Sequence, residues 1–367
     1  MRGFLYYCQR CIPRQLRSSS SSSPRVNIFS SHFCGFFEPR GLGAAFRYYL
    51  ALPHLKIMDE QTNQCPYVVG NTIKLGLKIK DVEVSTNAQI VKLFEPFTLS
   101  CVMVVRISCP KLTLEGDMVL KLFDRRFATQ LREDDKIRPW TPEIERAYHQ
   151  FVIDGGASHF IADLNNDDDT AQQGETWNSS QDEAYLYDTV SDLYQTEIEV
   201  YDALENMQGD DIPQLLAQVT IPGVRLTEKE PERRYIGVSG ILLQYVEGFP
   251  LTDLASHTPR EAWQSTCEKA IQILHRMSDH GILNEDVKTR SFIVRKDGSA
   301  EGGYEVFMID FAVCNFRKDY ADDAEWNEEK AIQDEEGAVG LFMQARLKGG
   351  FVFRPSGRYQ KSAQCVE

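Results

Sequence analysis

Four charged residues could take part in chemistry, because of their types and their places in the chain. Asp286 and Lys288 lie two residues apart in a polar loop, and Asp310 directly follows an apolar run. Lys121 lies inside another apolar run, much earlier in the chain. A carboxylate can accept a proton or bind a hard cation, and an ammonium group can neutralise an anion. These side chains can act together only if the fold brings the two halves of the chain to one place.

The segment around Lys121 is predicted to form strands. Residues 88–94, 97–107 and 118–123 are rich in β-branched and aromatic residues, which favours three strands in an antiparallel meander. Because side chains alternate along a strand, Lys121 is expected on the face opposite to its two leucine neighbours.

The rest of the chain mixes helices with short strands, which predicts the α+β class. A helix is expected from Pro142, with Thr141 as its N-cap. Apolar residues at helical spacing predict three more helices, over 192–207, 258–281 and 326–347. Further strands are expected over 212–220, 240–246, 291–295 and 304–309.

The order of these motifs resembles the catalytic core of the protein-kinase-like superfamily. The matching motifs, in order, are Val119-Leu120-Lys121, the segment 240–253, Asn284-Glu285-Asp286-Val287-Lys288 after a long helix, and Asp310-Phe311 after a strand. Residues 199–213, with the pattern Glu-Val-Tyr-x-x-Leu-x-x-Met-Gln-Gly-x-x-Ile-Pro, look more closely like a group of fungal kinase-like proteins. The resemblance covers about residues 88–345.

The resemblance implies a bilobal protein-kinase-like fold of the α+β class. Residues 88–246 would form a small lobe with an antiparallel sheet and a long insertion at 124–190. Residues 247–350 would form a reduced helical large lobe. Residues 58–87 would be a lead-in, and residues 351–367 a C-terminal tail.

The resemblance also implies ATP and Mg²⁺ as cofactors and suggests a role for each candidate residue. Asp310 would bind Mg²⁺, with the hydroxyl of Ser291 as a further ligand. Lys121 would reach the nucleotide phosphates. Asp286 would accept or orient the proton of a substrate hydroxyl, and Lys288 would offset charge on the transferring phosphoryl group.

The segment 240–253 would provide the adenine pocket. Leu243 would border this pocket, and backbone groups of Gln244 and Val246 would pair with the base. The expected partners are therefore a nucleotide and a protein or small-molecule substrate that the sequence does not identify.

Two helix carboxylates could hold Lys121 in place. Glu143-Ile144-Glu145 and Glu197-Ile198-Glu199 are near-duplicates. We favour Glu197, because this second pair precedes the Gln-Gly-x-x-Ile-Pro part of the fungal kinase-like pattern, and Glu145 is the alternative.

Departures from the family's motifs leave three functions open. Ser291 stands where the family has asparagine, Ala312 stands where it has glycine, and no glycine occurs between Gly76 and Gly116. The hairpin expected at 94–101 therefore lacks the glycines that wrap phosphates with backbone N–H groups. The first function is an ATP-dependent phosphotransferase resembling protein Ser/Thr kinases. The alternatives are a pseudokinase that acts as a binding or scaffold module, and a small-molecule kinase of the aminoglycoside or choline type.

Composition limits the partners. The chain has 367 residues and a net charge of −14, with 42% hydrophobic and 11% aromatic residues. This composition allows a substantial core and disfavours a nucleic-acid partner. No uncharged apolar run reaches the length of a membrane-spanning helix, so we expect no membrane span.

Residues 1–57 have a different composition from the rest. They hold seven arginines and Lys56 against the single acid Glu38, and they include the serine run 18–23. This pattern is typical of an organelle transit segment. A disordered basic tail, or sequence upstream of a start at Met58, are the alternatives. We expect a cytoplasmic or nuclear location, or a mitochondrial one if residues 1–57 are a transit segment.

Overall fold

The computed structural model describes residues 65–166, 177–221, 232–297 and 303–359. Its class is α+β, with antiparallel sheets and several helices, as the sequence predicts. The basic segment 1–57 lies outside the described residues, so its predicted role stays a prediction.

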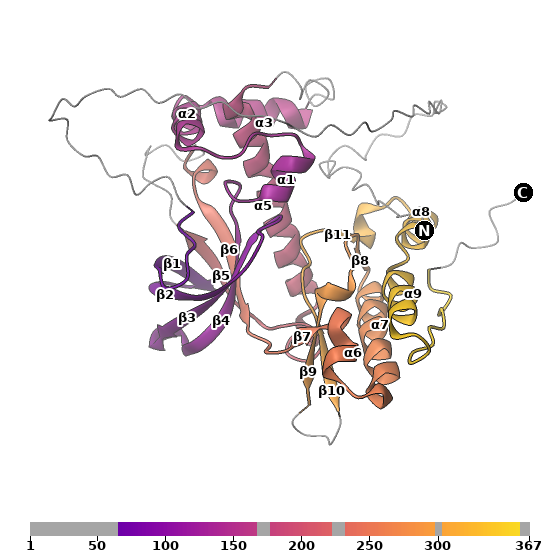
Figure 1. Ribbon diagram of the computed structural model, residues 1–367. Coiled ribbons are helices and arrows are strands. Elements are labelled where there is room, and N and C mark those ends of the chain that lie inside the picture. Colours follow the sequence, from indigo (N-terminus) through magenta and orange to yellow (C-terminus); the bar gives the residue numbers. More distant parts are fainter. Residues whose placement is uncertain (1–64, 167–176, 222–231, 298–302, 360–367) are drawn as a thin grey trace, which may run out of the picture. The chain divides into compact units, whose positions relative to one another are not determined.

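An antiparallel sheet closed into a barrel dominates the first part (Figure 1). The strands follow one another around the barrel in the order β1-β2-β3-β4-β6-β5, and β1 pairs with β5 to close it. Leu75, Leu77, Met103 and Leu120 are among the apolar side chains buried in its core. The strand bounds are β1 Thr72–Ile79, β2 Val82–Phe94, β3 Cys101–Cys109, β4 Leu114–Phe123, β5 Leu215–Ile221 and β6 Val238–Gln244.

The sheet starts earlier than the sequence predicts. The lead-in prediction for 58–87 is wrong for residues 72–87, which form β1 and the first part of β2. Apolar residues alternate along β1 with period two, which suits a strand with one buried face. Gly76 permits the closure, because a Cβ at this position would lie 2.6 Å from Thr220 Oγ1 on β5.

The predicted insertion at 124–190 forms helices in the residues that the structure describes. Thr141 caps α2 as predicted, since its hydroxyl accepts a hydrogen bond from the Ile144 N–H. Helix α5 begins well before the predicted start at residue 192, because Asn178 and Gln181 form a capping box at its N-terminus. The helix bounds are α1 Thr129–Asp134, α2 Pro142–Ile153, α3 Gly156–Asn166 and α5 Ser179–Ala203.

The second part packs two small sheets against helices. Strands β10, β9 and β7 form one sheet, β11 and β8 form the other, and α7 packs against β10 and α9. The helix predicted over 326–347 is divided, because Asp334 adopts φ 40° and caps α9 by accepting a hydrogen bond from the Gly337 N–H. The bounds are β7 Phe249–Pro250, α6 Leu254–His257, α7 Trp263–Asp279, β8 Ile282–Asn284, β9 Phe292–Lys296, β10 Tyr304–Met308, β11 Cys314–Phe316, α8 Asp323–Gln333 and α9 Glu335–Leu347.

The segment after α9 is not a free tail in the part that the structure describes. Phe351 and Tyr359 are buried, and the Tyr359 hydroxyl donates a hydrogen bond to Glu335. The prediction of a tail from residue 351 is therefore wrong for 351–359. Residues 360–367 lie outside the described residues.

The described helices do not have the character of membrane spans. Within the described ranges, none is long and apolar enough to cross a bilayer. Even α5, with 25 residues, carries acidic side chains along its length, among them Asp182, Asp188 and Glu197.

Candidate functional site

Lys121 lies at the centre of the candidate site, on strand β4. Its neighbours Leu120 and Leu122 are buried in the barrel core, so Lys121 points to the opposite face, where α5 packs against β4 and β6. The Lys121 Nζ lies 2.6 Å from Glu197 Oε2 on α5 and 2.7 Å from Asp310 Oδ1 after β10. One buried ammonium group therefore joins the sheet, the helix and the loop after β10.

These contacts shift the pKa values of all three groups. Burial disfavours a charged Lys121, but the carboxylates of Asp310 and Glu197 outweigh burial and raise its pKa above the usual lysine value. Lys121 lowers the pKa of Asp310, and the positive charges of Lys288 and Arg290 add to this effect. Burial raises the pKa of Glu197, and attraction to Lys121 offsets only part of that rise. The charge of Glu197 thus depends on the lysine beside it.

Glu145, the alternative partner of Lys121, binds other groups. Its carboxylate accepts hydrogen bonds from Arg125 and Trp140, each at 2.8 Å, and lies 3.0 Å from the ring of His149. Of the two candidates, Glu197 is the one that contacts Lys121.

Asp310 is held in an unusual backbone conformation. Its φ is 74°, in the left-handed region that few residues other than glycine adopt. The side chain of Asn284 donates a hydrogen bond of 3.0 Å to the Asp310 carbonyl. The next residue, Phe311, is buried against Tyr201 of α5, with 5.5 Å between the ring centroids. Such a conformation is kept only when the surroundings fix it, and it is common at functional sites.

Asp286 and Lys288 lie together in the loop after β8. Both side chains are about two-fifths exposed, and they form an ion pair. The Asn284 side chain reaches this loop as well, because its Oδ1 accepts the Asp286 N–H at 2.8 Å. Asn284 thus ties the Asp286 loop to Asp310. This role of Asn284 was not predicted, although an asparagine two residues before the N–H that it binds is a known turn pattern.

Glu335 holds Asn284 in place through a hydrogen bond to its backbone. Its side chain is buried at the start of α9, where Oε1 accepts the Asn284 N–H at 2.8 Å and Oε2 accepts the Tyr359 hydroxyl at 3.0 Å. Burial raises the pKa of Glu335 to about 8, although both hydrogen bonds oppose the rise. Glu335 was not among the predicted residues, because its partners lie far away in the sequence.

Replacing Glu335 with glutamine is expected to flatten the pH dependence of stability between about pH 5 and pH 8. The folded pKa of about 8 lies above the ordinary value of 4.5, so in this range the folded protein holds a proton that the unfolded chain has lost. This stabilisation is complete below the ordinary value and is lost as the pH rises through the folded value. The slope is about −1.4 kcal/mol per pH unit.

Urea unfolding at several pH values measures this slope. Glutamine does not titrate, and its carbonyl can still accept the Asn284 N–H. Glu261→Gln, at an exposed position, is the matched control and should keep the wild-type slope. A Glu335→Gln slope equal to that of the wild type would contradict the assignment.

Ser291 lies next to the strand that leads to Asp310. It is buried, its N–H donates to the Lys288 carbonyl, and its own carbonyl accepts the Ile309 N–H at 2.8 Å. Its hydroxyl makes no hydrogen bond with Asp310 among the described residues, so its role as a metal ligand stays a prediction.

The exposed carboxylate of Asp310 is a suitable ligand for a hard cation. Its side chain is 53% exposed, Oδ1 contacts Lys121, and Oδ2 accepts no hydrogen bond from the described residues. Within the described ranges, no group of three or more His, Cys, Asp and Glu side chains could hold a metal ion. Mg²⁺ in phosphate sites commonly uses one or two carboxylates, with phosphates and waters as its other ligands. The donor set is therefore compatible with Mg²⁺ that arrives together with phosphate groups.

The predicted adenine-pocket residues lie at the end of β6 and just after it. Leu243 is two residues along β6 from Ile241, the ladder partner of Lys121, so Leu243 and Lys121 share a face of the sheet. Gln244 donates its backbone N–H to Gln214, at 2.9 Å, which leaves that N–H engaged. Val246 is buried just after the strand.

The hairpin between β2 and β3 lies where the sequence predicts, at residues 95–100. It is adjacent to Lys121, because the second residue of β3 pairs with Lys121 in the ladder. Phe97 at its tip is buried, its ring lies 6.2 Å from that of Tyr67, and its carbonyl accepts a hydrogen bond from Thr129 of α1. The hairpin is therefore fixed to α1 and to the segment before β1.

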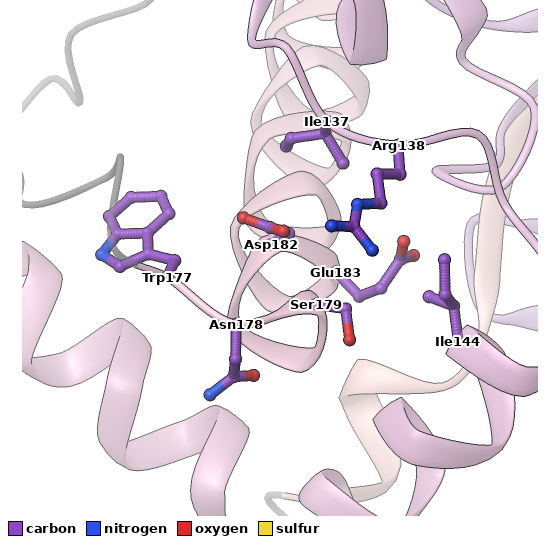
Figure 2. Close-up of a pocket in the computed structure, with 8 residues that line it drawn as sticks. All are labelled: Ile137, Arg138, Ile144, Trp177, Asn178, Ser179, Asp182 and Glu183. Carbon is purple, nitrogen blue, oxygen red and sulfur yellow. The ribbon is translucent and has the colours of Figure 1, made fainter.

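A cavity of about 220 Å³ lies in the helical insertion (Figure 2). Figure 2 shows Arg138 directed into it, near Asp182 and Glu183. Glu183 is buried and paired with Arg125 and Arg132, so its charge is compensated. None of the predicted site residues lines this cavity, whose walls are Ile137, Arg138, Ile144, Trp177, Asn178, Ser179, Asp182 and Glu183.

Comparisons with known proteins identify no family. No family model matches the chain, and no curated protein matches it. Among solved structures, the BubR1 kinase domain matches with a TM-score of 0.36 and 11% sequence identity, over 81% of this chain and 70% of that chain. A likeness with so low a TM-score does not indicate a function for this chain.

Proposed function

We propose that the chain has a bilobal protein-kinase-like fold and is a phosphotransferase that binds ATP with Mg²⁺. The observation that carries the proposal is the double ion pair of buried Lys121 with Glu197 and Asp310. A lysine held by a helix carboxylate can present its ammonium group to phosphates. The exposed aspartate beside it can hold a cation on the same phosphates.

Each residue of the site would have its own role in phosphate transfer. Mg²⁺, when bound, would neutralise phosphate charge, with Asp310 and Ser291 as its ligands. Lys121 would orient the phosphates from the sheet. Asp286 would accept the proton of the acceptor hydroxyl, and Lys288 would stabilise negative charge beside it.

The base would lie along β6 in this arrangement. Leu243 would border the adenine. Gln244 would contribute its carbonyl, because its N–H is already donated to Gln214. Backbone groups of Val246 would complete the pairing.

A second candidate is a pseudokinase that binds partners without turnover. The hairpin at 95–100 favours it, because this hairpin lacks glycine and Phe97 fixes it to α1. A hairpin held in this way offers fewer flexible backbone N–H groups to phosphate than a glycine-rich one.

Nucleotide binding is the first test. Mg-ATP at about 100 times its Kd should stabilise the full-length protein by about 2.7 kcal/mol, which corresponds to a rise in Tm of roughly 4 °C. ATP with EDTA and Mg²⁺ alone are the controls, and both should give smaller shifts. The absence of any shift with Mg-ATP would refute both ATP binding and turnover.

Phosphate transfer separates the two candidates. Transfer from labelled ATP to mixed protein and small-molecule acceptors should be lost in Asp286→Ala, while the Mg-ATP shift in Tm remains. Nucleotide binding without transfer in the wild type would favour the pseudokinase.

A further inference from the structure

Arg290 is a cation beside the candidate site that the proposed function does not use. It lies in the short turn Thr289–Ser291, between two buried residues. Thr289 is fixed by a hydrogen bond of 2.7 Å to Thr252, and the Ser291 carbonyl accepts the Ile309 N–H. Because both neighbours are held inward, the exposed Arg290 has a fixed backbone from which its side chain extends.

Arg290 also differs from the other cations of the site, because it has no partner among the described residues. Lys121 is paired with two carboxylates, and Lys288 is paired with Asp286. In the part of the chain that the structure describes, Arg290 makes no hydrogen bond or ion pair. Its charge is nevertheless close enough to act on Asp310.

The charge of Arg290 is opposite in sign to the net charge of the chain. The chain has a net charge of −14, so its general field attracts cations and repels anions. Arginine binds carboxylate and phosphate groups through two parallel hydrogen bonds, which makes it a specific receptor for them. The neighbouring Asp286 is the residue expected to face the acceptor hydroxyl.

We propose that Arg290 binds an anionic side chain of a peptide phosphoacceptor and so selects acidic or phosphorylated sequences. This inference rests on the proposed function, because it takes the Asp286 side of the site as the acceptor side. The carboxylate of a glutamate and the phosphate of a phosphoserine share the chemistry that Arg290 recognises.

Peptide binding tests the inference without requiring turnover. Three fluorescent peptides with one central serine, flanked by glutamate, phosphoserine or lysine, are titrated with full-length protein, Mg²⁺ and a non-hydrolysable ATP analogue. We expect the glutamate or the phosphoserine peptide to bind roughly tenfold or more tightly than the lysine peptide. The tighter of the two anionic peptides identifies the group recognised. Non-specific attraction to this acidic protein would give the opposite order.

Substitutions of Arg290 test whether this residue binds the anionic peptides. Arg290→Ala should weaken binding of the anionic peptides by about tenfold, and Arg290→Glu should reverse the preference toward lysine. Arg354→Ala is the matched control, because Arg354 is also exposed and without a partner among the described residues. Tightest binding of the lysine peptide, no peptide binding, or no effect of Arg290→Ala would each overturn the inference.

Thermal shifts with Mg-ATP on the same samples separate the two proposals. Loss of the nucleotide shift with retained, Arg290-dependent peptide binding would remove the proposed phosphotransferase and keep the anion site. A normal shift in Tm with Mg-ATP, without binding of the anionic peptides, would refute the anion site and keep the proposed phosphotransferase.

Discussion

Asp310→Asn is expected to abolish the Mg²⁺-dependent part of ATP binding while leaving the protein folded. Asparagine is among the few residues that tolerate a positive φ, so the backbone conformation with φ 74° can be kept. The amide lacks the negative charge that a hard cation requires. A charge-assisted contact contributes about 1.5–3 kcal/mol, so the Kd for Mg-ATP should rise by roughly ten- to a hundredfold.

Isothermal titration with and without EDTA measures this effect. The variant should bind ATP equally weakly in both conditions, whereas the wild type should bind more tightly with Mg²⁺. Asp202→Asn, an exposed position on α5, is the matched control and should behave as the wild type. Undiminished Mg²⁺ dependence in Asp310→Asn would show that Asp310 is not the metal ligand.

Lys121→Met should lower the free energy of unfolding by about 3–5 kcal/mol near pH 8, because it leaves Glu197 as an unpaired buried carboxylate. We expect this to be the largest loss of stability among the substitutions proposed for this protein. The Lys121 side chain is 6% exposed and that of Glu197 is 1% exposed, so water cannot replace the missing partner. ATP binding should be lost as well, since the ammonium group is the proposed phosphate contact.

The loss of stability should depend on pH. Burial already raises the pKa of Glu197, and without Lys121 the main opposing influence is gone. A carboxyl with a raised folded pKa stabilises the protein at low pH and loses this contribution as the pH rises through that pKa. Lys121→Met should therefore be closer to wild-type stability at about pH 5 than at about pH 8.

A second substitution tests the cause. Lys121→Met with Glu197→Met replaces the buried pair by apolar side chains and should recover most of the stability, although not ATP binding. Urea unfolding at both pH values measures all variants, with the exposed Lys74→Met as control. A double variant no more stable than Lys121→Met would contradict the explanation.

The charged residues of the site could be predicted because their signals are local. Lys121 lies between two leucines of an apolar strand, which alone determines the face on which it lies. Asp310 follows an apolar strand, and Asp286 and Lys288 are neighbours in one loop. The sequence also singled out Glu197, and the structure places it against Lys121.

Features that depend on distant contacts could not be predicted. Asn284 and Glu335 meet across 51 residues, and neither residue type indicates that contact. Arg290 becomes a candidate only because its neighbours are buried and no carboxylate in the described ranges pairs with it. The break at Asp334 has no proline or glycine to mark it, and the pairing of β1 with β5 joins segments separated by the whole helical insertion.

Closure of the barrel has a consequence for self-association. An unpaired outer strand is a template onto which another chain can add its own strand, and this is a common start of aggregation. Residues 76–78 of β1 pair with residues 218–220 of β5, so neither strand offers these backbone groups to a second molecule. Two features therefore oppose aggregation. The net negative charge makes copies of the chain repel each other, and β1 and β5 pair with each other where they would otherwise be edge strands.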